Sequence, residues 1–493
     1  MPELAHAGRM EERLGELRAF LKGLDASAAT QSFELEKFER LWKSTISLCP
    51  ECLRHVPGLA YEIGGRVLIR KRCETHGLSD AVLENDSRYY NVSNKDQWGR
   101  RYTTDDGLTF PAFDDGKGQT VCGENGFEYA DQSRNKSCTI LVEVTDACNL
   151  ACAVCYSDAR GSRKLPLADF QKHLRALSVQ KGVLDSVQLT GGEALLHPEF
   201  WEMVAFLHEL AAVKKIYLPT NGIKFADRQL TQRLIPYRAK VMALLQFDGG
   251  ETKTNRALRN ANLTETRHKA LENLADAGIH TQLTMTITLG VNDHEIGWVI
   301  DAGMRYDHVK VVALQPVTYS GRYDLSQDPM KRLTLSDVIK RAVAQVKCAP
   351  DEGDFHPIPC SHPNCGWITL YARRFGLKVN LARHIDLERV MGRVANRTLL
   401  NTGELRSAIG LDGGGVLRRG GEWLGKKLVR STDVFAIAIK PFMDKFNYDQ
   451  DRISACCHHL LDTRGRPVSF CEYNARLRTA DPWERFPSVE AKA

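Results

Sequence analysis

Between residues 138 and 320, short hydrophobic runs alternate with longer stretches whose apolar residues recur every three or four positions. The short runs are rich in β-branched and aromatic residues and predict strands at 138–144, 186–190, 215–221, 241–249, 280–290 and 309–319. The longer stretches predict helices at 167–180, 199–213 and 266–278. This alternation predicts an α/β fold with a parallel sheet, open or closed into a barrel. Six such strands match a six-stranded partial (β/α)6 barrel better than a full eight-stranded barrel.

The rest of the chain has a different pattern and divides into further segments. Residues 1–45 predict a helical segment that is polar on one side. Residues 46–90 contain short alternating stretches between cysteine pairs, which indicates a small metal knuckle of strands and turns. Residues 91–137 are polar and predict a linker. We expect the α/β core to cover 138–330 and a C-terminal domain to cover 331–493.

Composition describes an ordinary globular protein. The 493 residues are 43% hydrophobic and 26% charged, and no apolar run is long enough to cross a membrane. The N-terminus lacks the apolar core of a signal peptide, so we expect a cytoplasmic protein. A net charge of +6 suits weak attraction to anionic substrates or lipid surfaces, and it does not indicate nucleic-acid binding.

Fourteen cysteines change this picture. Eleven of them fall into four groups, at 49/52/73, 148/152/155, 360/365 and 456/457/471. A reducing compartment disfavours structural disulfides, so grouped cysteines there indicate metal binding or catalysis. Buried apolar cysteines would explain single positions but not four groups.

The group at Cys148, Cys152 and Cys155 follows the first predicted strand, where parallel α/β sheets collect their ligand sites. Three thiolates are one fewer than a fully ligated iron–sulfur cluster needs, which leaves one iron open to another ligand. The alternative is a zinc site completed by a distant histidine. The motif "TDACNLACAVCYSDA" resembles the radical S-adenosylmethionine (SAM) enzymes. The resemblance implies a 4Fe–4S cluster whose open iron binds SAM, and formation of a 5′-deoxyadenosyl radical.

Three further segments carry the same resemblance. "QLTGGEALLHPEF" ends the second predicted strand, "LPTNG" the third and "LQFDG" the fourth. Glycines allow close backbone approach to a ligand, and a carboxylate can hold an ammonium group. The resemblance assigns the first segment to the SAM amino group. It implies that the cofactor is bound by Gly191, Gly192, Glu193, Asn221 and Asp248, with Tyr156 contacting the adenine in place of an aromatic residue at position 154.

The N-terminal cysteines form two facing knuckles. Cys49 and Cys52 make the first, and Cys73 and His76 the second, although Cys122 could replace the histidine. Four such ligands suit a mononuclear tetrahedral zinc or a rubredoxin-like iron. We expect this metal to stabilise a small domain rather than to transfer electrons.

The C-terminal cysteines predict a second iron–sulfur site. Two residues from each of two segments could hold an auxiliary 4Fe–4S cluster, and we expect Cys360, Cys365, Cys457 and Cys471 to do so. The sequence does not assign Cys122, Cys138, Cys348 and Cys456. One auxiliary cluster is expected rather than two, because three of the eight remaining cysteines are isolated in sequence.

The assembly resembles one branch of the superfamily, the archaeal tetraether lipid synthases and their bacterial relatives. The resemblance rests on "CPEC", "CETHG", "IPCSHPNC", "VFAIAIKPFMDKFNYD" and "CCHHLLDTRGRPVSFCEYN". It implies carbon–carbon coupling of lipid chains, a reductant such as ferredoxin or flavodoxin, and peripheral contact with a membrane. This chain lacks the run of cysteines that the branch carries before its core. The alternatives are methylation of a pterin-type cofactor or radical modification of another small molecule or a peptide.

Overall fold

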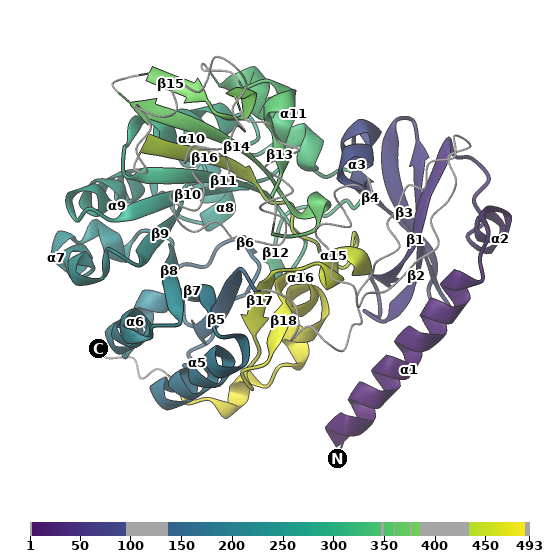
Figure 1. The fold of residues 1–493 in the computed structure, drawn as a ribbon, viewed down its shortest axis with the longest axis horizontal. Coiled ribbons are helices and arrows are strands. Elements are labelled where there is room, and N and C mark those ends of the chain that lie inside the picture. Colours follow the sequence, from purple (N-terminus) through teal and green to yellow (C-terminus); the bar gives the residue numbers. More distant parts are fainter. Residues whose placement is uncertain are drawn as a thin grey trace, which may run out of the picture.

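The computed structural model describes residues 2–94, 137–346, 350–358, 360–374, 377–384 and 433–488. An N-terminal helix leads into a small antiparallel sheet, which lies beside a large α/β unit (Figure 1). The C-terminal elements, drawn in yellow, pack between these two parts (Figure 1). No helix in the described ranges has both the length and the hydropathy that a membrane span requires.

The large unit is built on one sheet whose centre is parallel. Its six predicted strands are present, as β5 (Thr139–Thr145), β7 (Leu184–Gly191), β8 (Val213–Thr220), β9 (Val241–Gln246), β10 (His280–Ile287) and β11 (Val309–Pro316). They pair in this order across the sheet, and every pairing is parallel. The predicted α/β fold with a parallel sheet is therefore confirmed.

Helices cover the outer face of this sheet. The main ones are α5 (Leu167–Lys181), α6 (Phe200–Glu209), α8 (Thr252–Arg259), α9 (Thr264–Asp276), α10 (Ile296–Arg305) and α11 (Leu335–Gln345), with the short α7 (Arg228–Gln232) beside them. Alternate strand residues such as Val187, Ile216 and Leu283 are fully buried in the same hydrophobic cluster as the apolar faces of these helices. The opposite face of these strands lines the cavity that is described below.

Strands from the C-terminal part extend the sheet at both ends. β16 (Val434–Ile439) pairs in parallel with β11, and β17 (His458–Leu461) pairs in parallel with β5. Antiparallel strands follow at each side: β13 (His356–Pro357), β14 (Trp367–Arg374), β15 (Leu377–Asn380) and β18 (Pro467–Ser469). The sheet thus continues past the expected core boundary at residue 330, because segments distant in sequence complete it.

The small unit is a four-stranded antiparallel sheet. Its strands are β1 (Arg40–Leu48), β2 (His55–Ile63), β3 (Arg66–Cys73) and β4 (Gly77–Glu84), paired in chain order. Around them lie α1 (Pro2–Lys22), α2 (Ala26–Ser32) and α3 (Ser87–Asn94). The expected helical segment therefore ends before residue 40, where β1 begins. The expected linker lies mostly outside the described residues.

Polar side chains on β1 attach the small sheet to the C-terminal segment. Lys43 is 1% exposed, and its Nζ lies 2.8 Å from Asp449. Thr45 Oγ1 donates to Asp449 Oδ1 at 2.7 Å, and Ser47 Oγ donates to the Tyr448 carbonyl at 2.7 Å. These residues alternate along β1, so one face of the strand makes the attachment.

Candidate active site and metal centres

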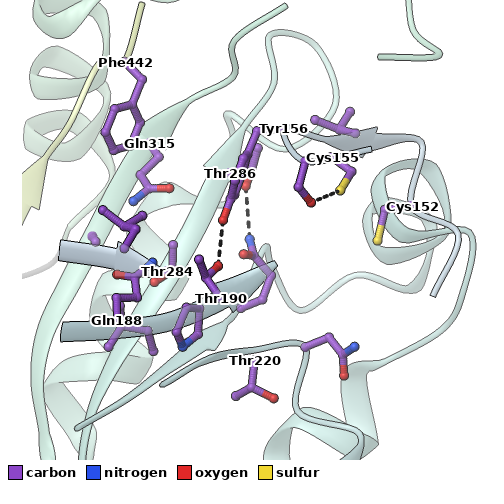
Figure 2. Close-up of a pocket in the computed structure, with 18 of the residues that line it drawn as sticks. Cys152, Cys155, Tyr156, Gln188, Thr190, Thr220, Thr284, Thr286, Gln315 and Phe442 are labelled. Atoms are coloured by element: carbon purple, nitrogen blue, oxygen red, sulfur yellow. Dashed lines mark hydrogen bonds between the residues drawn. The ribbon is translucent and has the colours of Figure 1, made fainter. Parts of the chain in front are cut away.

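The three core cysteines lie in the loop that follows β5, at the carboxyl end of the parallel sheet. Cys148, Cys152 and Cys155 line one cavity of about 280 Å³ (Figure 2). The last of them belongs to β6 (Val154–Cys155), which pairs with β12 (Arg322–Tyr323). Arg322 also donates to the Cys152 carbonyl, which fixes the loop from the other side. The sequence motif therefore places three thiolates along one wall of a cavity.

Gly191 and Gly192 allow the end of β7 to touch the cysteine loop. Gly191 has φ +121°, and an added Cβ there would lie 2.0 Å from the Thr145 carbonyl oxygen. A Cβ on Gly192 would lie 2.0 Å from the carbonyl oxygen of Ala147. The Gly192 and Glu193 amides donate to these same two carbonyls, at 2.8 and 2.9 Å. The glycines thus serve first to position the cysteine loop, although both also line the cavity.

Glu193 presents a buried carboxylate to the cavity. It is 1% exposed, and its Oε2 accepts a hydrogen bond from the Asn221 backbone at 2.9 Å. Its Oε1 has no hydrogen-bond partner among the described residues. Burial raises the pKa of Glu193 to about 7. An unpartnered carboxylate oxygen in a buried site is suited to an ammonium group such as that of SAM.

The raised pKa of Glu193 predicts a pH-dependent affinity for SAM. Below about pH 7 the carboxyl becomes protonated and loses its charge, so the KM for SAM should rise as pH falls through this value. Glu193→Gln should raise this KM about 10- to 100-fold at neutral pH and flatten the pH profile. Initial rates of 5′-deoxyadenosine formation measure both effects. Glu202→Gln, at an exposed position on α6, is the matched control; an unchanged KM in Glu193→Gln would exclude this role.

Asn221 and Tyr156 also line the cavity. The Asn221 side chain donates to Asn149 Oδ1 at 2.7 Å and so connects the end of β8 to the cysteine loop. The Tyr156 hydroxyl lies 2.9 Å from Thr190 Oγ1, and its ring makes an edge contact with Phe470. Burial raises the pKa of Tyr156, so it remains a neutral phenol. Both residues thus line the cavity, and their contacts with the cofactor stay a prediction.

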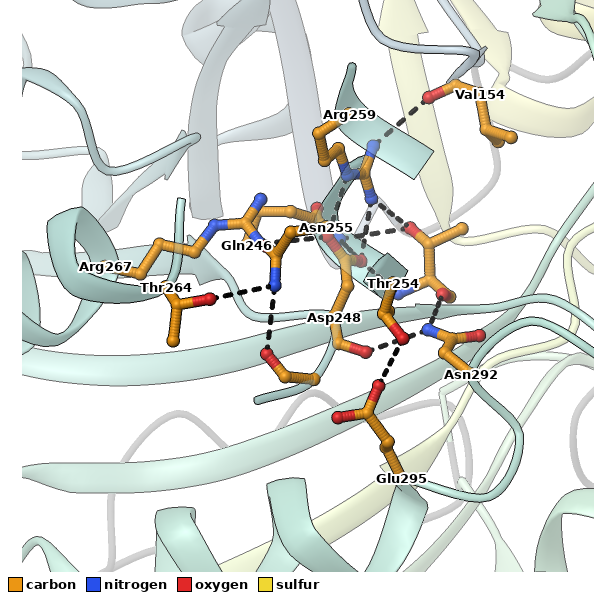
Figure 3. A network of polar contacts seen from close by, with 12 residues as sticks. Val154, Gln246, Asp248, Thr254, Asn255, Arg259, Thr264, Arg267, Asn292 and Glu295 are labelled. Carbon is orange, nitrogen blue, oxygen red and sulfur yellow. Dashed lines mark hydrogen bonds and ion pairs between the residues drawn. The ribbon is translucent and has the colours of Figure 1, made fainter. Parts of the chain in front are cut away.

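Asp248 differs from its expected role. It does not line the cavity, because both of its oxygens are occupied by neighbours (Figure 3). Arg259 Nε and Nη2 donate to them at 2.7 and 2.8 Å, and Arg267 Nη1 lies 3.2 Å away. Burial alone would raise the pKa of Asp248, but the two guanidinium groups lower it to about 2. Asp248 therefore holds two arginines and is a positioning residue.

Two arginines also belong to the cavity, and the sequence motifs did not indicate them. Both line the cavity, and with Asp248 they leave one net positive charge. Burial lowers the pKa of Arg267 only to about 10, so it stays charged at neutral pH. Its Nε and Nη2 have no hydrogen-bond partner among the described residues. No sequence motif surrounds Arg259 on α8 or Arg267 on α9, so the sequence alone did not indicate that they line the cavity.

The residues around the cavity fit the implied cofactors. Three thiolates can hold a 4Fe–4S cluster, Glu193 offers a site for the SAM ammonium, and Arg267 offers one for its carboxylate. When bound, a reduced 4Fe–4S cluster with SAM supplies a 5′-deoxyadenosyl radical. The protein contributes the positioning of both groups.

The N-terminal ligands form a second centre, at one end of the small sheet. Cys49, Cys52, Cys73 and His76 place their ligand atoms within 4.8 Å of one another. Cys52 Sγ lies 3.9 Å from Cys73 Sγ, and His76 Nδ1 lies 3.5 and 3.6 Å from Cys49 and Cys73 Sγ. Tetrahedral zinc with Zn–S bonds of about 2.3 Å has sulfur–sulfur edges of about 3.8 Å. The four residues therefore fit one tetrahedral metal.

The C-terminal cysteines gather differently from the prediction. Cys138, Cys360 and Cys457 lie together, with their sulfur atoms within 4.8 Å of one another. This group adjoins the cavity, because its chain neighbours Thr139 and His458 line it. An auxiliary cluster here would use Cys138, which the prediction had left unassigned.

The other two predicted ligands, Cys365 and Cys471, lie near Cys456. Burial raises the pKa of the Cys456 thiol to about 12, and Cys365 and Cys138 both add to this shift. Burial also raises the pKa of Cys471, and Cys456 and Cys365 contribute further. Cys138 thus lies near both groups of cysteines, and the expected ligand set of Cys360, Cys365, Cys457 and Cys471 stays a prediction. Cys122 and Cys348 lie outside the described residues.

Separate clusters at these two groups of cysteines would give additive losses of iron. Cys360→Ala and Cys456→Ala should each remove up to about four irons per chain, and the double variant should remove the sum. Iron and sulfide analysis of the reconstituted proteins measures the losses. If all six cysteines served one cluster, the double variant would lose no more iron than either single variant.

Comparisons with known proteins agree with this geometry. A family model for the radical SAM superfamily matches residues 142–302, and a model described as "HMPTM N-terminal zinc ribbon domain" matches residues 41–85. A 7,8-dihydro-6-hydroxymethylpterin dimethyltransferase from Methanocaldococcus jannaschii is 26% identical, over 88% of this chain and 94% of its own length.

Other relatives match mainly the core. A GTP 3′,8-cyclase from Pelotomaculum thermopropionicum is 30% identical over 37% of this chain and 59% of its own length. The structure of SuiB from Streptococcus suis is 15% identical, with a TM-score of 0.36, over 42% of this chain and 45% of that protein. The three-thiolate cavity and the matching core model lead to one conclusion: residues 142–302 form a radical SAM core, and the chain is a SAM-dependent radical enzyme with an N-terminal zinc ribbon.

Proposed function

We propose that this enzyme methylates a reduced pterin. The observation that carries the proposal is the similarity to the pterin dimethyltransferase, which extends over 88% of this chain and 94% of the relative. A similarity of this extent reaches well beyond residues 142–302, which the core model matches. The GTP cyclase and a mycofactocin maturase from Mycobacterium ulcerans each match little more than a third of the chain.

The cavity offers hydrogen-bonding groups to a polar ring, beside apolar residues such as Leu141, Leu244 and Phe442. Its amides and hydroxyls on the strands are Gln188, Thr190, Gln246, Gln282, Thr284, Thr286 and Gln315. These residues occupy alternate positions, so they share the inner face of the sheet while the other strand residues face the helices. The mixed lining suits a substrate with a polar edge and an apolar face. It gives no specific support to the expected lipid coupling, to the tetraether synthase branch or to contact with a membrane.

The proposed reaction needs residues that hold the cluster and SAM, a wall that faces the pterin, and a source of electrons. The core cysteines, Glu193 and Arg267 hold the cluster and SAM, and the amide-rich wall faces them across the cavity. A soluble reductant such as ferredoxin or flavodoxin supplies the electron. The group of Cys138, Cys360 and Cys457 adjoins the far part of the cavity, where an auxiliary cluster would lie close to the substrate.

The test is anaerobic reconstitution with iron, sulfide, SAM and a chemical reductant, followed by addition of 7,8-dihydro-6-hydroxymethylpterin. One SAM gives 5′-deoxyadenosine and methionine, and a second SAM donates each methyl group and leaves as S-adenosylhomocysteine. We therefore expect 5′-deoxyadenosine, S-adenosylhomocysteine and a pterin heavier by one or two methyl groups, all detected by mass spectrometry. Formation of 5′-deoxyadenosine without any methylated pterin would contradict the proposed substrate. A coupled lipid product from added lipid would favour the earlier hypothesis instead.

A further inference from the structure

Two glutamines in the cavity are unlike the other polar residues around them. Resting on the proposed function, we propose that Gln188 and Gln315 recognise the amino–oxo pyrimidine edge of the substrate ring. They would thereby act as specificity-determining residues of this enzyme. The proposal concerns which ring the enzyme accepts, and it makes no claim about the radical step.

Both glutamines point from the inner face of the sheet into the same cavity. Gln188 on β7 stands opposite Leu141 on β5 and Tyr217 on β8 in the strand register, and all three line the cavity. Gln315 on β11 stands opposite Thr286 on β10. β7 and β11 are four strands apart, so only a curved sheet brings their residues to one cavity. In Figure 2 both glutamines lie across the cavity from Cys152 and Cys155.

The other two glutamines on the inner face, Gln246 and Gln282, have side-chain hydrogen-bond partners. The Gln246 amide donates to Asp248 Oδ1 at 2.6 Å and to Thr286 Oγ1 at 3.1 Å. The Gln282 amide donates to Thr284 Oγ1 at 3.0 Å. No described residue makes a side-chain hydrogen bond to Gln188 or Gln315, although Gln188 is only 8% exposed. Neither amide is among the fully buried polar atoms without a partner, so both are accessible from the cavity, where water or a ligand can satisfy them.

An amide side chain matches one kind of ring edge particularly well. Its carbonyl accepts a hydrogen bond and its NH₂ group donates one, side by side. The amino–oxo pyrimidine edge of a pterin offers adjacent donors and acceptors in the complementary order. Phe442 and Phe470, whose rings lie 4.8 Å apart, line the same cavity and offer apolar surfaces for a planar ring. The wall thus combines edge recognition with stacking.

The experiment measures binding to the reconstituted, SAM-loaded enzyme. Gln188→Leu and Gln315→Leu should each weaken binding of 7,8-dihydro-6-hydroxymethylpterin about 10- to 100-fold, and the Kd for SAM should stay unchanged. Gln229→Leu, at an exposed position on α7, is the matched control. The wild type should also reject a pteridine without the 2-amino group, and the variants should lose part of this preference.

The outcomes separate this inference from the proposed function. If the wild type binds the pterin through these amides but forms no methylated product, recognition stands and methylation fails. If it binds guanosine instead, with the same dependence on the two glutamines, the edge is recognised but the pterin assignment fails. If both leucine variants bind the pterin like the wild type, or the wild type binds neither ring, the inference is overturned.

Discussion

Replacing Cys152 with alanine is expected to reduce formation of 5′-deoxyadenosine to background. The three core thiolates line one cavity and each would hold a different iron, so the variant retains only two of three protein ligands to the cluster. The absorption and EPR signals of the core cluster should also fall, in proportion to the iron that this cluster loses. Anaerobic assays with SAM and a reductant, analysed by liquid chromatography, give the measurement.

Ala151→Ser is the control for this experiment. Ala151 lies in the same loop at an exposed position, and a serine there leaves all three thiolates in place. Its rate of SAM cleavage should equal that of the wild type. If Cys152→Ala still cleaved SAM at the control rate, the core motif would not be the site of radical formation.

The second large effect is expected from Gly192→Ala. The added Cβ would lie 2.0 Å from the Ala147 carbonyl oxygen, a distance that atoms cannot adopt, so β7 and the cysteine loop must separate. Glu193 and Cys148 are next to the two colliding residues and would move with them. Since a displacement of about 1 Å in a reacting geometry can cost about 100-fold, 5′-deoxyadenosine formation should fall by at least that factor.

Gly353→Ala provides the matched comparison. An added Cβ at Gly353 meets no atom within 4 Å, and this glycine does not require a positive φ. The variant should cleave SAM at the wild-type rate. Thermal unfolding of both variants shows whether Gly192→Ala acts locally, as expected, or unfolds the chain. Normal SAM cleavage by a folded Gly192→Ala would show that the contact between β7 and the cysteine loop is dispensable.

The local patterns in the sequence predicted the centre of the fold and its main motif. Each of the six core strands is a short apolar run, and its residues form the pairings expected for a parallel sheet. The spacing of Cys148, Cys152 and Cys155 was sufficient to place three thiolates in one cavity, because they share one loop. The sequence also predicted that the pairs Cys49/Cys52 and Cys73/His76 bind one metal. This was possible because both pairs lie at turns of the same small sheet.

Contacts between distant segments could not be predicted in this way. Cys138 joins Cys360 and Cys457 across more than two hundred residues, and nothing in the sequence around Cys138 indicates this contact. Asp248 ends its strand as a cofactor ligand would, but burial beside Arg259 and Arg267 makes an ion pair its stable state. The role of a buried carboxylate thus depends on which charged residues the fold places beside it.

The strands β16 and β17 have a consequence for synthesis of the chain. Both edges of the six-stranded core receive their parallel neighbours from residues after 433. During translation, β5 and β11 would therefore present unpaired backbone until almost the whole polypeptide has left the ribosome. Exposed edges of this kind favour association between chains. A nascent chain that stops before Val434 would have its cysteine motif and most of its apolar core, yet it would be prone to aggregate.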